Sequence, residues 1–421
     1  MLMLQNFSYK KNFLHAEEVS LVDIAKQVGT PCYVYSRHAL EQNWQSFTNA
    51  FGTVAHRICY AVKANATLAI LNIFAAQHAG FDIVSVGELE RVLLAGGEAK
   101  HIIFSGVAKQ SSEILRAIEV GVGCFNVESE SELERLHKLA EQQKKIVNIA
   151  IRINPNIDAR THPYIATGLS DNKFGIDMRD VLSLYKKIKA TMPYCQLTGI
   201  ACHIGSQLTE LSPFVEAMDC VLTLVAELKT AGITLKHVDM GGGLGVRYQN
   251  ETPPTVIEYI HVLCEKLKNS GLEIIIEPGR ALVANAGVLL TRVEYLKKTP
   301  SKNFAIVDAG MTELLRPALY DAWHPIMPVE QHSNLPEVIY DIVGPVCESA
   351  DFLGKDRLLA LGEGDLIAIG FVGAYGACMS SNYNARPRAA EVMVDKDKVH
   401  VVRARESIQD LISRESLFSL T

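Results

Sequence analysis

The sequence predicts an α/β protein in which a (β/α)8 barrel is followed by a second, mostly β domain. Eight short apolar runs alternate with helical patterns from residue 58 onward, and eight β-then-α units in about 220 residues are typical of this barrel. The runs are too apolar for strands with one exposed face, which indicates that both faces are covered. Beyond residue 281 strand-like runs dominate, and this change predicts the second domain.

The expected barrel strands and helices follow one another in regular order. The strands cover residues 58–62, 81–84, 101–104, 124–127, 148–153, 197–203, 237–240 and 272–276, and helical patterns include 68–78, 88–95, 131–142, 214–231 and 255–269. An open doubly wound sheet would explain the alternation, but not the polar residues that follow most of these strands. We therefore favour the barrel.

The second domain is expected to resemble a β-sandwich or barrel. Strand-like runs cover 304–307, 338–343 and 365–371, and the runs 391–394 and 399–402 flank a four-residue turn and predict a hairpin. Helical patterns occur only at 318–323 and after Ser407, and the strand-like segment 32–35 is expected to pair with this domain. The predicted domains are thus 36–281 for the barrel, and 1–35 together with 282–421 for the β domain.

Composition and charge exclude several classes of protein. The chain is 48% hydrophobic and 21% charged with a net charge of −6, so it lacks the excess of basic residues that is typical of proteins that bind nucleic acid. No apolar run approaches the roughly 20 residues of a membrane helix, and residues 1–13 do not resemble a signal peptide. Nine cysteines without a Cys-x-x-Cys pair fit a reducing cytoplasm better than disulfides or a metal site. We expect a cytoplasmic protein with neither a nucleic-acid nor a membrane partner.

Lys63 is the most informative residue, because it lies where the first barrel strand gives way to a helix, in Cys59-Tyr-Ala-Val-Lys-Ala-Asn65. A lysine beside apolar residues loses its proton readily and can attack a carbonyl. Enzymes that use pyridoxal phosphate need such an amine to hold the cofactor as a Schiff base. Most lysines are solvated surface charges, so the interpretation depends on the residues that accompany this one.

Polar residues follow most of the other barrel strands, and the carboxyl ends of these strands meet at the face where barrels carry their active sites. These residues are Ser85, Ser105, Arg152, Asn154, His203, the glycine cluster 241–245 and Glu277.

Three of these features suit a phosphorylated, planar cofactor, and each also has a structural interpretation. Glycines at 241–245 let backbone N–H groups approach a phosphate, although a flexible turn explains them equally well. Glu277 can pair with a pyridinium nitrogen, or form a structural ion pair with Arg280. His203 can stack on a cofactor, transfer a proton, or serve only the structure.

The second domain contributes further candidates. Cys347, in a Gly-Pro-containing segment at the end of an expected strand, can donate a proton to a carbanion, or be a small buried apolar residue. Arg316 and Tyr320 lie four residues apart, and if Pro317 opens a helix they share one side of it and can bind a carboxylate, or form a solvated pair. Tyr375, expected at the end of an apolar strand, can reach a phosphate or a substrate, or cap the core.

Taken together, these segments resemble the diaminopimelate decarboxylase family, in the alanine-racemase-like, fold-type III group of pyridoxal phosphate enzymes. The resemblance extends from about residue 31 to about residue 403. It rests on the motifs Tyr-Ala-Val-Lys-Ala-Asn, His-Ile-Gly-Ser-Gln, Gly-Gly-Gly-Leu-Gly, Glu-Pro-Gly-Arg, Arg-Pro-x-Leu-Tyr and Gly-Pro-x-Cys-Glu-Ser-x-Asp, of which the last two separate this family from its relatives.

The resemblance implies a role for each motif. Lys63 carries the cofactor, His203 stacks on its ring, Glu277 pairs with its nitrogen, and Cys347 is the proton donor. The implied cofactor-binding residues are Lys63, His203, Ser206, Gly242, Gly243, Glu277, Pro278, Gly279, Arg280 and Tyr375. The implied substrate-binding residues are Arg280, Arg316, Tyr320, Glu348 and Tyr375, with Cys347 and Glu348 supplied by the partner subunit of a homodimer. Asp82 and Arg152 are expected to support the ring pocket, and Asn172-Lys-Phe-Gly175 resembles the family's substrate-side segment.

The implied reaction is decarboxylation of meso-2,6-diaminopimelate to L-lysine, the last step of lysine biosynthesis. An ornithine or arginine decarboxylase would need an acidic pocket, whereas Arg316 favours an anionic substrate end. A racemase would need a second base, typically a tyrosine, opposite Lys63. A non-catalytic cofactor-binding protein would not need the complete set of groups, and a class I aldolase would leave residues 241–245 and Glu277 unexplained.

Overall fold

The computed structural model describes residues 4, 6–157, 173–331 and 334–419 of the chain. Contacts between residues divide the chain into two compact units. The barrel unit comprises Glu41–Arg247 and Glu251–Leu282, and the β unit comprises Met1–Leu40, Tyr248–Asn250 and Val283–Thr421.

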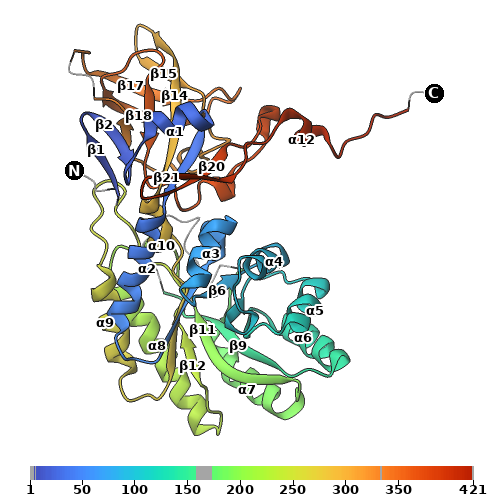
Figure 1. Cartoon of the computed structure of the whole chain (residues 1–421). Coiled ribbons are helices and arrows are strands. Elements are labelled where there is room, and N and C mark those ends of the chain that lie inside the picture. The colour runs from blue at the N-terminus through green and yellow to red at the C-terminus, as the bar shows by residue number, and fades with distance from the viewer. Residues whose placement is uncertain (1–3, 5, 158–172, 332–333, 420–421) are drawn as a thin grey trace. The chain divides into compact units, whose positions relative to one another are not determined.

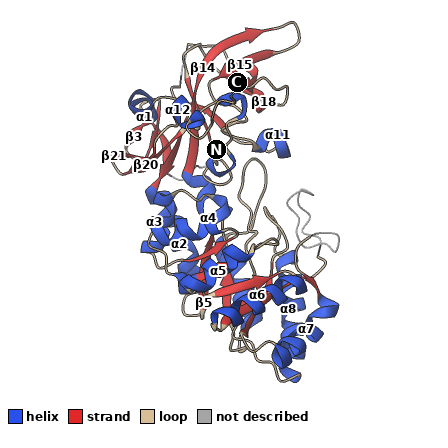
Figure 2. Cartoon of the chain, turned by 90° about the vertical axis from the view of Figure 1, so that its right-hand side faces the viewer, coloured by secondary structure: helices blue, strands red, loops and turns tan. Residues whose placement is uncertain are grey.

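The barrel unit contains a closed ring of eight parallel strands, which confirms the predicted fold class (Figures 1 and 2). Each strand pairs with the next, and the ring is closed by pairing of the last strand with the first. A ninth, two-residue strand, β10 (Ile176–Asp177), extends the sheet beside β9. The ring consists of β5 (His56–Ala61), β6 (Gly80–Ile83), β7 (Ile102–Phe104), β8 (Cys124–Val127), β9 (Val147–Asn154), β11 (Cys195–Cys202), β12 (His237–Asp239) and β13 (Glu273–Ile276).

Helices follow the strands, as expected for this barrel. Their starts are set by local capping: Ser85 and Ser129 each accept a hydrogen bond from the backbone three residues on, and Thr255 forms a capping box with Glu258. Ser85 thus caps a helix. The helices are α2 (Arg37–Phe51), α3 (Leu68–Ala76), α4 (Val86–Leu94), α5 (Ser111–Val120), α6 (Glu130–Gln143), α7 (Met178–Thr191), α8 (Ser212–Thr230), α9 (Val256–Leu267) and the short α10 (Arg280–Val283).

The inside of the barrel is filled by small and medium apolar side chains. One buried cluster contains a residue from each of six strands: Cys59, Ile103, Cys124, Ala150, Ala201 and Ile275. Because side chains alternate along a strand, the residue two positions later lies on the same side of the strand. For five of the six strands that residue is polar, namely Ser105, Asn126, Arg152, His203 and Glu277. The barrel therefore changes from an apolar to a polar filling within one step along its strands.

The β unit is built around a sheet in the order β18–β17–β15–β14–β4–β20–β21, with β19 also paired to β14. Strand β4 pairs with both β14 and β20, which confirms that the segment 32–35 joins this sheet. The strands are β4 (Cys32–Ser36), β14 (Gly287–Lys298), β15 (Asn303–Val307), β16 (Ile326–Pro328), β17 (Val338–Val343), β18 (Phe352–Leu359), β19 (Leu366–Ile369), β20 (Ala390–Asp395) and β21 (Lys398–Arg403).

Several local expectations for the β unit were incomplete or wrong. The long strand β14 and the strand β18 were not predicted, and neither were the sheet of β1 (Phe7–Lys10), β2 (Phe13–Ala16) and β3 (Val19–Ser20) and the helix α1 (Leu21–Val28). The turn of the β20–β21 hairpin has two residues, 396–397, because Asp395 and Lys398 still pair. Two helices, α11 (Arg316–Tyr320) and α12 (Ile408–Ile412), lie near the expected helical patterns. No helix within the described ranges is long and apolar enough to cross a membrane.

Candidate active site

Lys63 lies at the carboxyl end of β5, in the single 3-10 turn Val62–Ala64 that leads toward α3. Its Nζ is 2.5 Å from Oδ2 of Asp82, which is fully buried at the carboxyl end of β6. The other carboxylate oxygen of Asp82 is buried without a hydrogen-bond partner among the described residues. Asp82 therefore holds the amine in place and retains an acceptor that is available for a further group.

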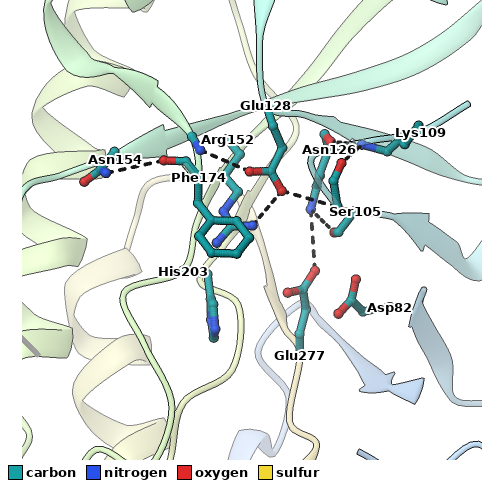
Figure 3. A network of polar contacts seen from close by, with 12 residues as sticks. Asp82, Ser105, Lys109, Asn126, Glu128, Arg152, Asn154, Phe174, His203 and Glu277 are labelled. Carbon is teal, nitrogen blue, oxygen red and sulfur yellow. Dashed lines mark hydrogen bonds and ion pairs between the residues drawn. The ribbon is translucent and has the colours of Figure 1, made fainter. Parts of the chain in front are cut away.

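The buried carboxyl groups of Asp239 and Glu277 line the same pocket as the amine, and Figure 3 shows Glu277 together with Asp82. Asn126 donates a hydrogen bond to Oδ2 of Asp239 at 3.0 Å and a longer one to Oε1 of Glu277 at 3.5 Å. Burial raises the pKa of Glu277 well above its ordinary value, and the charges of Asp239 and Asp82 raise this pKa further. Burial also raises the pKa of Asp239, but the hydrogen bonds that this carboxylate accepts from Glu277 and the backbone of Gly241 counteract the increase. Burial beside Asp239 and Asp82 therefore disfavours the charged form of Glu277.

His203 follows β11 on the opposite side of the pocket from Asp82 (Figure 3). Its Nδ1 accepts a hydrogen bond from the backbone N–H of Gly242 at 3.2 Å. Desolvation lowers the pKa of His203 well below its ordinary value, and the charges of Arg152 and Lys63 lower it further. The ring is therefore neutral, with its remaining proton on Nε2, and it presents an uncharged aromatic surface to the pocket.

The glycine cluster after β12 comes so close to neighbouring backbone that side chains would not fit. A Cβ at Gly242 would lie 2.3 Å from the carbonyl oxygen of Glu277, and one at Gly243 would lie 2.7 Å from that of Gly205. Gly243 also has a φ of +117°, which L-residues rarely adopt. Nearby, Nη2 of Arg280 donates a hydrogen bond to Ser206 Oγ at 2.9 Å, so these two predicted cofactor residues are in contact.

These groups fit pyridoxal phosphate. The pocket has a volume of about 160 Å³ and is lined by Lys63, Val84, Ser105, Gly106, Asn126, Arg152, Phe174, Ala201, Cys202, His203, Asp239 and Glu277. Lys63 offers the amine that the cofactor's carbonyl requires, and Glu277 offers a carboxyl group that can pair with a ring nitrogen. The close-packed glycines allow the close approach of backbone that a phosphate site requires.

The predicted site residues of the β unit lie in three places: on α11, in a turn after β19, and in the loop between β17 and β18. Arg316 and Tyr320 lie on α11, as expected, but Arg316 is buried, with Nη1 2.8 Å from Nε2 of His324 and its guanidinium over the ring of Tyr248. Tyr375 lies beyond β19 in a turn, with a φ of 56°, and so does not end a strand. Cys347 and Glu348 are exposed in the loop between β17 and β18.

Sequence reasoning missed two residues that shape the pocket. Asp239 lies within the predicted strand 237–240, and a carboxylate at the end of a buried run was a usable signal. Glu128 carries no such signal in the sequence, yet its carboxylate binds Arg152 at 2.6 Å. Of the predicted segment 172–175, Asn172 lies outside the described residues, whereas Phe174 lines the pocket.

Comparison with known proteins is consistent with this site. Residues 37–284 match the family model of the pyridoxal-dependent decarboxylases, pyridoxal binding domain. That match covers more than half of the chain, so the barrel and its pocket belong to a pyridoxal-dependent decarboxylase.

Relatives that match nearly the whole chain show which kind of pyridoxal-dependent decarboxylase it resembles. The chain is 54% identical to the diaminopimelate decarboxylase of Haemophilus influenzae over 411 residues, which cover 97% of this chain and 99% of the relative. It is also 54% identical to that of Vibrio cholerae over 413 residues, which cover 98% and 99%. The solved diaminopimelate decarboxylase of Helicobacter pylori, complexed with L-lysine, matches with a TM-score of 0.90 and 41% identity over 94% of this chain and 98% of that one.

The chain belongs to the diaminopimelate decarboxylase family. It is therefore a lyase of lysine biosynthesis whose cofactor is pyridoxal 5′-phosphate.

Proposed function

We propose that the protein decarboxylates meso-2,6-diaminopimelate to L-lysine and carbon dioxide, with Lys63 as the residue that binds the cofactor covalently. The observation that carries this proposal is the placement of the Lys63 amine, which is 2.5 Å from Asp82 in a pocket shared with Glu277 and His203. The names of relatives that are 54% identical over nearly their whole length support the choice of substrate.

Different residues of the barrel unit would hold the cofactor, orient the amine that binds it and pack against its ring. Lys63 would hold the cofactor through its amine and release it to the substrate's amine, while Asp82 orients the Lys63 amine. Glu277 would pair with the ring nitrogen of the cofactor. When bound, the cofactor would supply an electron sink for the electron pair left behind when carbon dioxide departs. His203 would pack against the cofactor ring as an uncharged aromatic group.

The phosphate is held by backbone and short polar side chains. Gly242, Gly243 and Gly279 present backbone groups at close range, and a Cβ at Gly279 would lie 3.0 Å from that of Ala64. Ser206 and the backbone of Arg280 complete this set, and we assign Tyr375 and Pro278 to cofactor binding as well. Arg280, Arg316, Tyr320 and Glu348 bind the substrate, with the two arginines directed to its distal carboxylate.

Cys347 returns a proton to the carbon that has lost carbon dioxide. Support comes from its exposed position and from the hydrogen bond that its backbone N–H donates to Oδ1 of Asn384 at 2.8 Å, which fixes the loop. We propose that Cys347 and Glu348 act in the active site of the partner subunit of a homodimer. All nine cysteines are free thiols, which suits the reducing cytoplasm as the place of action.

The role of Cys347 is tested by Cys347→Ala. This variant should bind the cofactor normally but turn over about 10²-fold or more slowly, as expected for loss of a positioned proton donor. The exposed Cys378 provides the matched control, because Cys378→Ala should retain parental turnover. Normal turnover by Cys347→Ala would contradict the assignment.

The substrate is tested with a panel of amino acids and purified holoenzyme. Lysine should form from meso-diaminopimelate, whereas ornithine, arginine and D-lysine should not react. Activity restricted to the substrates that end in a cation would overturn the proposal, because it would require an acidic distal pocket in place of Arg316.

A further inference from the structure

Glu128 brings together three separate parts of the barrel rim, although it does not line the pocket. It lies between β8 and α6 and is 4% exposed. Its Oε1 accepts hydrogen bonds from Nη1 of Arg152 at 2.6 Å and from the backbone N–H of Gly106 at 3.2 Å. Its Oε2 accepts one from the backbone N–H of Gly175 at 3.0 Å (Figure 3).

A second buried ion pair supports the first. The backbone N–H of Glu128 donates to Oε2 of Glu132 at 3.0 Å, and Oε1 of Glu132 accepts from Nζ of Lys109 at 2.7 Å. The same Nζ donates to the carbonyl oxygens of Gly106 and Asn126, each at 2.8 Å. All three ammonium protons of Lys109 are therefore used, and the backbone on either side of Glu128 is fixed. Satisfied networks of this kind make a buried region rigid.

The Glu128 carboxylate fixes the part of the pocket wall that contains Phe174. The guanidinium that it binds lies 4.9 Å from the centroid of the Phe174 ring. Asn154 donates to the carbonyl oxygen of Phe174 at 3.3 Å. Gly175 adopts a φ of +74°, and a Cβ there would lie 2.9 Å from the backbone of Ile153. Phe174 is thus held through its ring, its own carbonyl and the next residue.

Arg152 and Phe174 both line the pocket that contains Lys63 and His203. We infer that Glu128 is a positioning residue for the reaction, because its carboxylate sets the places of Arg152 and Phe174 in the pocket wall. This inference rests on the proposed function for its effect on turnover, but the positioning itself is a property of the chain alone. The electrostatics agree, since Arg152 is one of the charges that lower the pKa of His203.

Glu128→Gln tests the inference, because the amide keeps the size of the side chain but loses its charge and one acceptor. The control is Glu132→Gln, which makes the same chemical change in the neighbouring ion pair without touching Arg152 or Gly175. A second control is Glu130→Gln on the exposed side of α6, where the carboxylate pairs with Lys187 at the surface.

The first readout is independent of activity. The Phe174→Trp substitution introduces a fluorophore in the pocket wall. Its fluorescence is obtained by subtracting the emission spectrum of the protein in which Phe174 is retained. Adding Glu128→Gln should at least double the rate of collisional quenching by acrylamide, whereas Glu132→Gln should change it less and Glu130→Gln not at all. Unchanged quenching with Glu128→Gln would overturn the inference, whatever the substrate proves to be.

The second readout uses the holoenzyme with meso-diaminopimelate. Glu128→Gln should raise KM about tenfold with a smaller change in kcat, and should leave the absorbance of the bound cofactor intact. In an Arg152→Lys background, which retains the charge but loses the planar fork, the added effect of Glu128→Gln should fall below threefold. A full tenfold effect in both backgrounds would contradict action through Arg152. If Glu128→Gln does not fold, Arg152→Lys alone should show the increased quenching, and its absence would equally refute the inference.

Discussion

The barrel contains two neighbouring regions of inward-facing side chains that lie on the same strands but differ completely in chemistry. The inner one is apolar and includes Cys124, Ala150 and Ile275. The outer one lies two residues further along, where Asn126, Arg152 and Glu277 stand on these same strands. The inner region stabilises the fold by excluding water, whereas the outer region retains charges and buried acceptors that a ligand can satisfy. A single step of the strand repeat therefore separates the residues that stabilise this barrel from those that carry its chemistry.

The largest effect is expected at the amine of the outer region. Lys63→Ala should reduce turnover by about 10⁴-fold or more, the order seen when a covalent catalytic group is removed. The fold should persist, because Lys63 lies at the end of its strand and packs no part of the apolar region. Turnover and the visible absorbance of the purified protein are the measurements. A variant that retains more than a hundredth of parental turnover would show that another residue does this work.

Glu277→Gln should lower turnover and also change how the stability of the fold depends on pH. Loss of the carboxyl group proposed to pair with the ring nitrogen should lower kcat by about 10³-fold, within the range of acid–base contributions. Because the folded-state pKa of Glu277 is raised, its contribution to stability is fully present below its ordinary pKa and is lost as pH rises through the folded value. The variant lacks this loss, so its stability relative to the parent should increase with pH. Denaturant unfolding at several pH values measures this, and a constant difference would contradict the raised pKa.

A charge placed in the inner region should damage the fold. Ala150→Asp would bury a carboxylate without a partner and should lower the free energy of unfolding by about 3–5 kcal/mol, the scale of an uncompensated buried charge. The neutral variant Ala150→Ser is the control for size and polarity and should cost about 1–3 kcal/mol. Urea unfolding compares the two. Equal costs would mean that the inner region tolerates charge as the outer one does.

His237 offers the smallest and most specific test, because it is a buried titratable group on β12, two residues before Asp239. Burial lowers its pKa to about 4, and the charges of Arg57 and Lys236 contribute. A group whose folded pKa lies below its unfolded value destabilises the fold as pH falls. Between pH 6.5 and 4 the parent should lose about 3 kcal/mol through this residue. The free energy of unfolding of His237→Gln should fall less over the same interval. If it depended on pH in the same way in both proteins, His237 would not control the loss.

The sequence predicted the barrel well because each strand is a short apolar run followed by a polar residue, as in 272–276 with Glu277. The same pattern singled out Lys63, His203 and Glu277, which the structure places around one pocket. It did not predict β14, because its residues Gly287–Lys298 pass from buried to exposed positions and so lack a uniform pattern. It also did not predict the contacts of Glu128, because its partners Gly106, Arg152 and Gly175 are brought to it by tertiary structure and not by spacing along the chain.

The most direct test of the account is to find which amine carries the cofactor. The holoenzyme is reduced with borohydride, which fixes the cofactor to its amine, and the modified peptide is identified by mass spectrometry. Lys63 should carry the added mass, whereas Lys63→Ala, treated in the same way, should carry none. Modification of a different lysine in the parent, such as the buried Lys109, would contradict the assignment of Lys63.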